Sequence, residues 1–426
     1  MSPIRRTAES ASRPGTSASS PSPRMTGTKE NDMSVDCRFG ANYTPSKAWL
    51  YGWIDWDAAS IRRDLEAIAG LGLDHIRLQC LWTYFQPNRT FVSPTMLTRL
   101  TEVVEMAAEC GLDVVICVLN GWMSGTFFRP LWQRESTNLF TDPEALDAER
   151  RLITAVAGAV EGHRNVLGID IGNEPNALAS YRGNDVTRSE GDAWANMLLE
   201  HSERVMPGGL HTIGVDHMPW LRDDAPFSRE HLGEAGAVTS IHSWVYFTGA
   251  LERYGRDGTG TLHLARYLIE LGRAYGRPVG RPVWLQEIGV STEWVPDDAL
   301  PEFAAALLRN ALIAKPWGVT WWCSHDIDRS LTGFDELEYD LGLLTVDNQV
   351  KPVGAALAEV IAAHRRGAAR DPGDFARPRP ELVLPEGQVP DLAFADGYFD
   401  LVARGEDPVI VCEKTAIVRS SRGSQV

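Results

Sequence analysis

The sequence predicts an α/β protein built on a (β/α)8 TIM barrel. Short runs rich in Val, Ile and Leu alternate along the chain with amphipathic stretches of helical period, and eight such runs can be counted. Their nearly continuous apolar character suits parallel strands that helices cover from outside. A doubly wound open sheet is the rival fold, and it is disfavoured because no GxGxxG or Walker loop follows any of the runs.

The expected elements follow one another in regular order. The eight strands are expected over residues 37–44, 75–82, 113–122, 166–174, 211–218, 238–247, 282–291 and 318–327. The first helix covers 57–72, where Asp57 can cap the N-terminus. A later helix is announced by Asp142 and Pro143, because an acidic cap followed by proline is typical of a first helical turn. The eighth helix is expected over 351–367, where it completes the repeat.

The chain divides into three parts. Residues 1–33 are rich in Ser, Pro and Thr and lack the hydrophobic core of a signal peptide, so we expect a disordered tail and a cytoplasmic protein. The barrel is expected over 34–370. Residues 371–426 begin with a Pro-rich linker, and their short alternating runs predict a few antiparallel strands packed on the barrel rather than an independent domain.

Composition and charge disfavour several classes of partner. Lys and Arg total 41 against 57 Asp and Glu, and the net charge of −16 opposes binding to a nucleic-acid backbone. No stretch approaches the roughly 18 uninterrupted apolar residues of a membrane span. The 6 cysteines lack CxxC spacing, so reduced and mostly buried thiols are expected.

Two glutamates stand at the ends of expected strands. Glu174 ends the fourth strand and Glu287 ends the seventh, and in a barrel of this kind catalytic groups lie at these C-terminal ends. Both side chains should meet across the barrel mouth, where two carboxyl groups about 5 to 5.5 Å apart would suit a retaining glycosidase. Taken alone, Glu174 before Pro175 is also typical of a helix start, but a second strand-terminal glutamate favours catalysis.

The motifs GNEPN and WLQEIG resemble glycoside hydrolase family 5 and the larger clan of retaining glycosidases, over roughly the whole barrel. The resemblance implies that Glu174 is the acid/base and Glu287 the nucleophile. It also implies that Asn173 hydrogen-bonds the 2-hydroxyl of the sugar. Arg77, in HIRLQ, matches the arginine of the family that keeps the nucleophile ionised by charge pairing.

Further positions match the family less completely. His242 in SIHSW matches the histidine of strand six, and Trp322 in TWWCS matches the sugar platform of strand eight. Trp321 is adjacent, and strand alternation lets only one of the two tryptophans face inward. The family usually has His-x-Tyr at strand six, whereas this chain has Trp244 there and Tyr246 two residues later. The side chain that orients the nucleophile is therefore expected to be Tyr246 or another residue.

One more aromatic residue is expected to face the sugar, and no metal or cofactor is expected. Trp122 stands in VLNGW, at the strand where the family often has a histidine. Five histidines and aspartates could be proposed as metal ligands, namely His217, His242, His325, Asp326 and Asp328. They come from different strands without HxH spacing, so hydrogen-bonding roles are the better interpretation.

Within the family, the segments NYTPSKAW, YFQPNRTFVSP, NLFTDP and WWCSHDIDR look most like the branch of bacterial β-mannosidases and mannan-acting enzymes. The resemblance implies a sugar with an axial 2-hydroxyl, as in mannose, in the −1 subsite and hydrolysis by double displacement. Because a signal peptide is not seen, short imported β-linked oligosaccharides trimmed from the non-reducing end are the expected substrates, so an exo-acting β-mannosidase is expected. A β-glucosidase, an endo-β-glucanase or an endo-β-mannanase on the same scaffold is the enzymatic alternative. A sugar-binding barrel without turnover is the alternative from another class.

Overall fold

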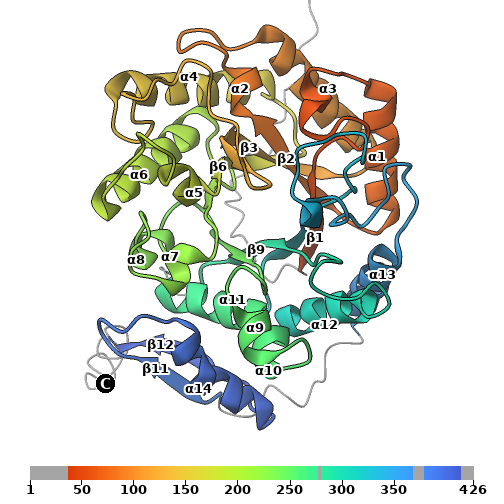
Figure 1. Ribbon diagram of the computed structural model, residues 1–426. Helices are drawn as coiled ribbons and strands as arrows, with labels where there is room; N and C mark the ends of the chain where they lie inside the picture. The colour runs from red at the N-terminus through yellow and green to blue at the C-terminus, as the bar shows by residue number, and fades with distance from the viewer. Residues whose placement is uncertain (1–36, 277–279, 368–378, 414–426) are drawn as a thin grey trace, which may run out of the picture. The chain divides into compact units, whose positions relative to one another are not determined.

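Eight parallel strands form the barrel of the computed structural model, which describes residues 37–276, 280–367 and 379–413 (Figure 1). The hydrogen-bonded order is β7-β6-β3-β2-β1-β10-β9-β8. The strands are β1 (Arg38–Tyr43), β2 (His75–Leu81), β3 (Asp113–Asn120), β6 (Val166–Asn173), β7 (Thr212–Gly214), β8 (Thr239–Ser243), β9 (Val283–Ile288) and β10 (Gly318–Trp321). Each lies within one of the eight expected runs, so the TIM barrel is confirmed.

The two strands at the ends of this order, β7 and β8, are joined by side-chain hydrogen bonds, which close the barrel. The hydroxyl of Thr212 on β7 donates to the carbonyl of Val238 over 3.0 Å, just before β8. The hydroxyl of Ser240 on β8 in turn donates to the carbonyl of Ile213 on β7. The remaining neighbours are joined by parallel backbone ladders, and β1 pairs with both β2 and β10.

Long helices lie outside the ring of strands (Figure 1). They are α1 (Ala58–Gly70), α3 (Pro94–Glu109), α4 (Pro143–Ala159), α6 (Arg188–Val205), α11 (Leu264–Tyr275), α12 (Leu300–Ile313) and α13 (Pro352–Arg365). The expected caps are present, since Asp57 accepts from the backbone N–H of Ser60 over 3.0 Å and Asp142 from that of Glu144 over 2.9 Å. Local sequence thus determines where α1 and α4 begin.

Short elements occupy the connections. They are η1 (Trp49–Trp53), α2 (Trp82–Phe85), β4 (Trp122–Met123), β5 (Thr126–Phe127), α5 (Pro175–Ala179), α7 (Met218–Leu221), α8 (Arg229–Leu232), α9 (Ala250–Tyr254), α10 (Thr259–Leu262) and η2 (Glu336–Glu338). Several of them follow the C-terminal ends of barrel strands, where active sites of this fold are built.

Polar side chains occupy the barrel strands among the apolar core. Asn42, Arg77, Gln79, Asp170 and Gln286 are all buried although they lie on β1, β2, β6 and β9. A buried polar group is destabilising unless it is hydrogen-bonded, so these five side chains must satisfy one another. They form the support of the site described below.

The C-terminal segment differs from expectation. It contains β11 (Glu381–Leu384), α14 (Leu392–Ala403) and β12 (Val409–Cys412), and the two strands pair in parallel rather than antiparallel. The reason is the helix between them, whose buried Phe394 and Tyr398 stand four residues apart. The segment packs on the barrel, because the hydroxyl of Tyr267 on α11 donates to the carbonyl of Pro390 over 2.6 Å.

The expected tail of residues 1–33 lies outside the described residues, and so does the junction between 370 and 371. The division of the chain into a barrel over 34–370 and an extension over 371–426 stays a prediction. Throughout the described ranges, every helix is too short or too polar to span a bilayer.

Candidate active site

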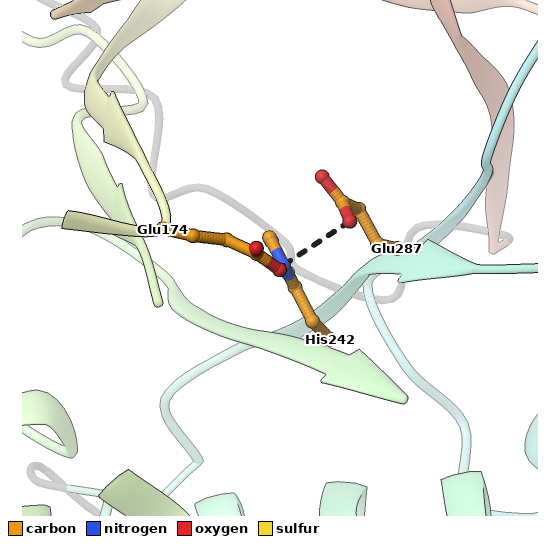
Figure 2. Close-up of side chains that lie close together, drawn as sticks. All are labelled: Glu174, His242 and Glu287. Atoms are coloured by element: carbon orange, nitrogen blue, oxygen red, sulfur yellow. Dashed lines mark hydrogen bonds and ion pairs between the residues drawn. The ribbon is translucent and has the colours of Figure 1, made fainter. Parts of the chain in front are cut away.

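The two strand-terminal glutamates converge at the barrel mouth. Glu174 directly follows β6, and Glu287 is the penultimate residue of β9. A carboxylate oxygen of each lies within 4.8 Å of the other and of a ring nitrogen of His242, and Figure 2 shows the three side chains directed toward one another. Carboxyl groups of retaining glycosidases lie about 5 to 5.5 Å apart, whereas inverting enzymes leave about 6.5 to 9.5 Å for a water. The spacing matches the retaining class.

Glu174 is held in an unusual backbone conformation. It has φ 43° and ψ 54°, in the left-handed region, and immediately precedes Pro175 at the start of α5. Its backbone N–H donates to the carbonyl of Gly214 over 2.6 Å. Its carboxylate accepts from Nε1 of Trp122 over 2.9 Å, and its Oε1 lies 2.8 Å from Nδ1 of His242. A strained residue that is fixed on both sides is typical of functional sites.

Glu287 is bound by a buried arginine. Nη1 of Arg77 donates to Oε1 of Glu287 over 2.7 Å, and the other Glu287 oxygen lies 3.3 Å from Nδ1 of His242. The same guanidinium donates from Nε to Asp170 over 2.8 Å and from Nη2 to Asn173 over 2.8 Å. Arg77 therefore connects β2, β6 and β9. Its permanent positive charge lies beside the carboxylate of Glu287.

Tyr246 does not hold the nucleophile in this arrangement. The sequence left open whether Tyr246 or another residue orients the nucleophile. Among the described residues, Arg77 and His242 bind Glu287. Tyr246 is 51% exposed, and its ring stacks on Trp294 with 4.8 Å between centroids. Trp244 is buried, and its ring meets the edge of Trp294 at 6.1 Å. Both residues belong to an aromatic group at the rim of the site.

Of the two adjacent tryptophans at the end of β10, Trp322 faces the site. Its indole approaches the carboxyl group of Glu338, which also interacts with both catalytic carboxylates. Its ring packs against Trp49 with centroids 6.4 Å apart. Nε1 of Trp321 instead donates to the carbonyl of Leu341 over 3.3 Å. The expected platform residue, Trp322, thus lies where a sugar could stack.

Gln286 fixes the proton arrangement of His242. Nε2 of Gln286 donates to the carboxylate of Asp170 over 3.1 Å, so the amide oxygen of Gln286 faces Nε2 of His242 at 2.9 Å. That ring nitrogen must therefore carry a hydrogen. Nδ1 then meets Glu174 at 2.8 Å, a contact that requires one further proton between the two groups. The pair is either an imidazolium with a carboxylate or an imidazole with a carboxylic acid.

Burial and the charges of the three groups shift one another's pKa values. Burial raises the pKa of Glu174, but the hydrogen bond and charge of His242 outweigh it and lower the pKa. Burial lowers the pKa of His242, but the charges of Glu287 and Glu174 raise it above its ordinary value. Burial, opposed by His242 and reinforced by the charge of Glu174, raises the pKa of Glu287 to about 7. The groups titrate as one set, which retains a proton near neutral pH.

Sequence reasoning missed the supporting residues. The amide oxygen of Asn42 accepts from Nη1 of Arg77 over 3.0 Å and from Nε2 of Gln79 over 2.9 Å, and Asp170 and Gln286 complete the set. Each is a polar side chain inside an otherwise apolar run, and that contrast was the available signal.

Gly214 on β7 makes room for this set. A Cβ at Gly214 would lie 2.6 Å from the amide oxygen of Gln286, 2.7 Å from Nη2 of Arg77 and 2.8 Å from Oδ2 of Asp170. Any side chain at this position would displace atoms that hold Glu287 and His242. The glycine is therefore required by the site rather than by its own strand.

The same cluster could in principle bind a metal ion. Glu174, His242 and Glu287 offer nitrogen and oxygen ligands within 4.8 Å of one another. The guanidinium of Arg77 already lies 2.7 Å from Glu287, and its fixed charge opposes a second cation beside it. The donor set fits acid–base chemistry better than metal binding, and the absence of a metal stays a prediction.

Parallel strands that carry two carboxyl groups this close together at their C-terminal ends define the active site of a retaining glycoside hydrolase. The model of the family described as cellulase (glycosyl hydrolase family 5) matches residues 39–208. The chain is also 39% identical to a GH5_18 protein from Streptomyces cattleya solved in complex with GlcNAc, over 90% of this chain and 95% of that chain, with a TM-score of 0.84. The chain belongs to glycoside hydrolase family 5.

Other solved structures are also similar to this chain. A Glu-to-Ala variant of the Streptomyces cattleya protein, in complex with Manβ1-4GlcNAc, is 40% identical over 89% of this chain and 94% of that chain, with a TM-score of 0.83. A GH5_18 protein from Bifidobacterium longum is 32% identical over 92% and 96%, with a TM-score of 0.84. An exo-β-1,4-mannosidase from an Opitutaceae bacterium is 24% identical over 88% and 69%, with a TM-score of 0.74, and supports the fold alone. No curated protein sequence matches this chain.

Proposed function

We propose that this glycoside hydrolase is a retaining exo-β-mannosidase that releases mannose from Manβ1-4GlcNAc and related short β-linked oligosaccharides. The observation that carries the proposal is the pair of carboxyl groups of Glu174 and Glu287 within 4.8 Å, one beside His242 and the other bound by Arg77. The mannose and GlcNAc units are proposed from the complexes of the GH5_18 proteins.

In the first half of the reaction, Glu287 attacks the anomeric carbon. The bond from that carbon to the leaving oxygen breaks as the bond to the Glu287 carboxylate forms, and the proton held between Glu174 and His242 passes to the leaving oxygen. Arg77 contributes by stabilising the ionised form of Glu287, which is the form that attacks.

In the second half, water releases the sugar. Glu174, now without its proton, accepts one from a water whose oxygen attacks the anomeric carbon, and the ester to Glu287 breaks. Two inversions give net retention. Asn173 accepts from Arg77 and donates one amide N–H to the carbonyl of Trp122 over 2.8 Å. Its second amide N–H can donate to the 2-hydroxyl, a contact that strengthens in the transition state.

Loop contacts support exo action. Trp49, in the loop after β1, packs on Trp322 and also on Phe334, whose centroid lies 5.4 Å away in the loop after β10. The turn between β4 and β5 reaches that same loop, because a Cβ at Gly125 would lie 3.2 Å from a carboxylate oxygen of Asp335. Loops after three strands thus contact one another beside the sugar platform. Such a wall suits a pocket for a chain end better than an open cleft.

The rim aromatics are proposed to carry the leaving sugar. Tyr246 and Phe247 are about half exposed, at 51% and 49%, and both rings contact Trp294. Exposed aromatic faces are well suited to stack on pyranose rings. They follow β8 and β9, the strands that carry His242 and Glu287, which supports a role for them next to the reacting groups.

A hydrolysis panel tests the proposal. The purified protein is assayed on Manβ1-4GlcNAc, β-mannan, and aryl β-mannoside and β-glucoside, and the anomer first released is identified by proton NMR. We expect β-mannose as the first product and preference for the mannosides. Glu287→Ala should abolish turnover, whereas Glu302→Gln, an exposed glutamate on α12, should not.

Each of the other outcomes would indicate a different activity for this protein. Release from the interior of mannan would indicate an endo-β-mannanase, and preference for the glucoside would indicate a β-glucosidase. Release of the α-anomer would contradict double displacement. Binding of β-glycosides without turnover would indicate a sugar-binding barrel.

A further inference from the structure

A third carboxyl group lies beside the two catalytic ones. Glu338 ends η2 in the loop after β10 and is only 8% exposed. Its backbone N–H donates to the carbonyl of Asp335 over 3.0 Å, which holds the turn. Its Oε2 atom is buried and has no hydrogen-bond partner of good geometry among the described residues. A buried carboxylate oxygen in this state is destabilising, so it requires an explanation.

Polar groups from two other segments face this carboxyl group. The hydroxyl of Ser124, in the turn between β4 and β5, approaches Glu338, and so does the indole of Trp322. Ser124 has φ 50°, and its Oγ atom is likewise buried without a well-aligned partner in the described residues. Two unsatisfied polar side chains on different loops thus meet beside the platform tryptophan.

Glu338 lies within electrostatic reach of the two reacting carboxyl groups. Burial raises the pKa of Glu338 to about 7, Ser124 and Trp322 oppose that shift, and the charges of Glu287 and Glu174 reinforce it. Asp170, the buried carboxylate that supports the site, is paired with the guanidinium of Arg77. The groups that face Glu338 are instead the hydroxyl of Ser124 and the indole of Trp322, neither of which carries a charge.

We infer that Glu338 is a sugar-binding residue, which accepts a hydrogen bond from a hydroxyl group of the mannose that stacks on Trp322 in the −1 subsite, with Ser124 beside it. The inference rests on the proposed function. A pyranose supplies hydroxyl donors that satisfy both the Glu338 carboxylate and the Ser124 hydroxyl without a change of fold. A carboxyl group accepts a hydrogen bond in either protonation state, so the contact contributes both affinity and orientation.

The test combines two substitutions with deoxygenated substrates. Glu338→Gln and Glu338→Ala are assayed on an aryl β-mannoside and on its 2-, 3-, 4- and 6-deoxy analogues. We expect roughly a ten- to hundredfold loss of kcat/KM on the parent sugar for Glu338→Ala, the size of one buried hydrogen bond whose partner is left unsatisfied. For one analogue, the one that lacks the bonded hydroxyl, the substitution should cause little further loss.

Matched variants separate binding from folding. Glu336→Gln changes an exposed glutamate on the same turn, paired with Arg329, and should leave all rates unchanged. Ser124→Ala probes the same subsite from the other loop and should affect the same analogue or its neighbour. If Glu338→Gln and Glu338→Ala reduce every substrate by one common factor, or reduce none, the inference is wrong.

Failure of the proposed function would look different. If the wild-type protein turns over the aryl β-glucoside and not the β-mannoside, the mannosidase proposal fails, and the deoxy series in the gluco configuration then tests Glu338 in the same way.

Discussion

His242 on β8 and Gln286 on β9 are joined by a contact of 2.9 Å between the imidazole Nε2 and the amide oxygen. Because the other end of the Gln286 amide donates to Asp170, the ring nitrogen must be the donor. The opposite nitrogen of the ring therefore has no hydrogen of its own unless His242 is charged or Glu174 supplies it. A fully buried glutamine thus maintains the proton that the acid/base group needs.

Gln286→Met should remove this control. The neutral imidazole could then carry its hydrogen on Nδ1 and donate to an ionised Glu174, so the extra proton is no longer required. We expect roughly a tenfold fall in kcat with a smaller change in KM. Nitrogen NMR of the histidine ring should show a hydrogen on Nε2 in the wild-type protein and on Nδ1 in the variant.

Gln79→Met is the matched control for that experiment. Gln79 belongs to the same buried set, through Asn42, but does not touch His242. It should cost stability to a similar degree and leave the ring hydrogen on Nε2. A ring that keeps its hydrogen on Nε2 in Gln286→Met would show that another group fixes the tautomer.

Glu174→Ala should impair the reaction according to the leaving group. Without a proton donor, departure of a sugar alcohol becomes slow, whereas an acidic phenol leaves without help. We expect a loss of roughly 10² to 10⁴ in kcat/KM on Manβ1-4GlcNAc and a much smaller loss on a dinitrophenyl β-mannoside. Added azide should restore turnover and give the β-mannosyl azide. Equal losses on both substrates would contradict the acid/base role.

The barrel could be predicted because its signal is local and repeated. Each strand is an apolar run bounded by turn residues, and the edge at which parallel strands end is the same for all of them. Glu174 and Glu287 could therefore be placed in one pocket from their positions in the chain alone. Arg77 and His242 were found by resemblance, and the structure places both against these carboxylates.

Other features depend on contacts between distant segments. The parallel pairing of β11 with β12 depends on α14, and strands of four residues carry too little pattern to show their direction. Glu338 ends the short helix η2 in the loop after β10, where Phe334 packs on Trp49 and Trp49 packs on Trp322. No periodicity in the sequence could indicate that. Tyr246 was placed by its spacing from His242, but its ring turns to Trp294 at the rim.

Gly214→Ala should damage the site through crowding. The added Cβ would come within 2.6 to 2.8 Å of atoms on Gln286, Arg77 and Asp170, none of which can retreat without losing a hydrogen bond. We expect a loss of about 2 kcal/mol in the free energy of unfolding, as for other overpacked cores, and at least a tenfold lower kcat/KM. Urea titration and aryl β-mannoside kinetics measure the two effects.

Gly158→Ala provides the comparison for Gly214→Ala. Gly158 lies in α4, and a Cβ there would meet nothing within 4 Å. Alanine should stabilise the helix by up to about 1 kcal/mol and leave activity unchanged. If Gly214→Ala were as harmless as Gly158→Ala, the close approach around Gly214 would not constrain the site.

Glu338→Gln should make the protein more stable at neutral and alkaline pH. The pKa of Glu338 is raised to about 7 from an ordinary 4.5, so its stabilising contribution is complete below pH 4.5 and is lost as pH rises through about 7. The wild-type protein should therefore lose up to about 3 kcal/mol relative to the glutamine variant between pH 4.5 and pH 8. Urea titrations at several pH values measure the difference. Glu336→Gln, at an exposed and ion-paired site, should give a curve parallel to the wild type, and a parallel curve for Glu338→Gln would mean that this carboxyl group ionises normally in the folded protein.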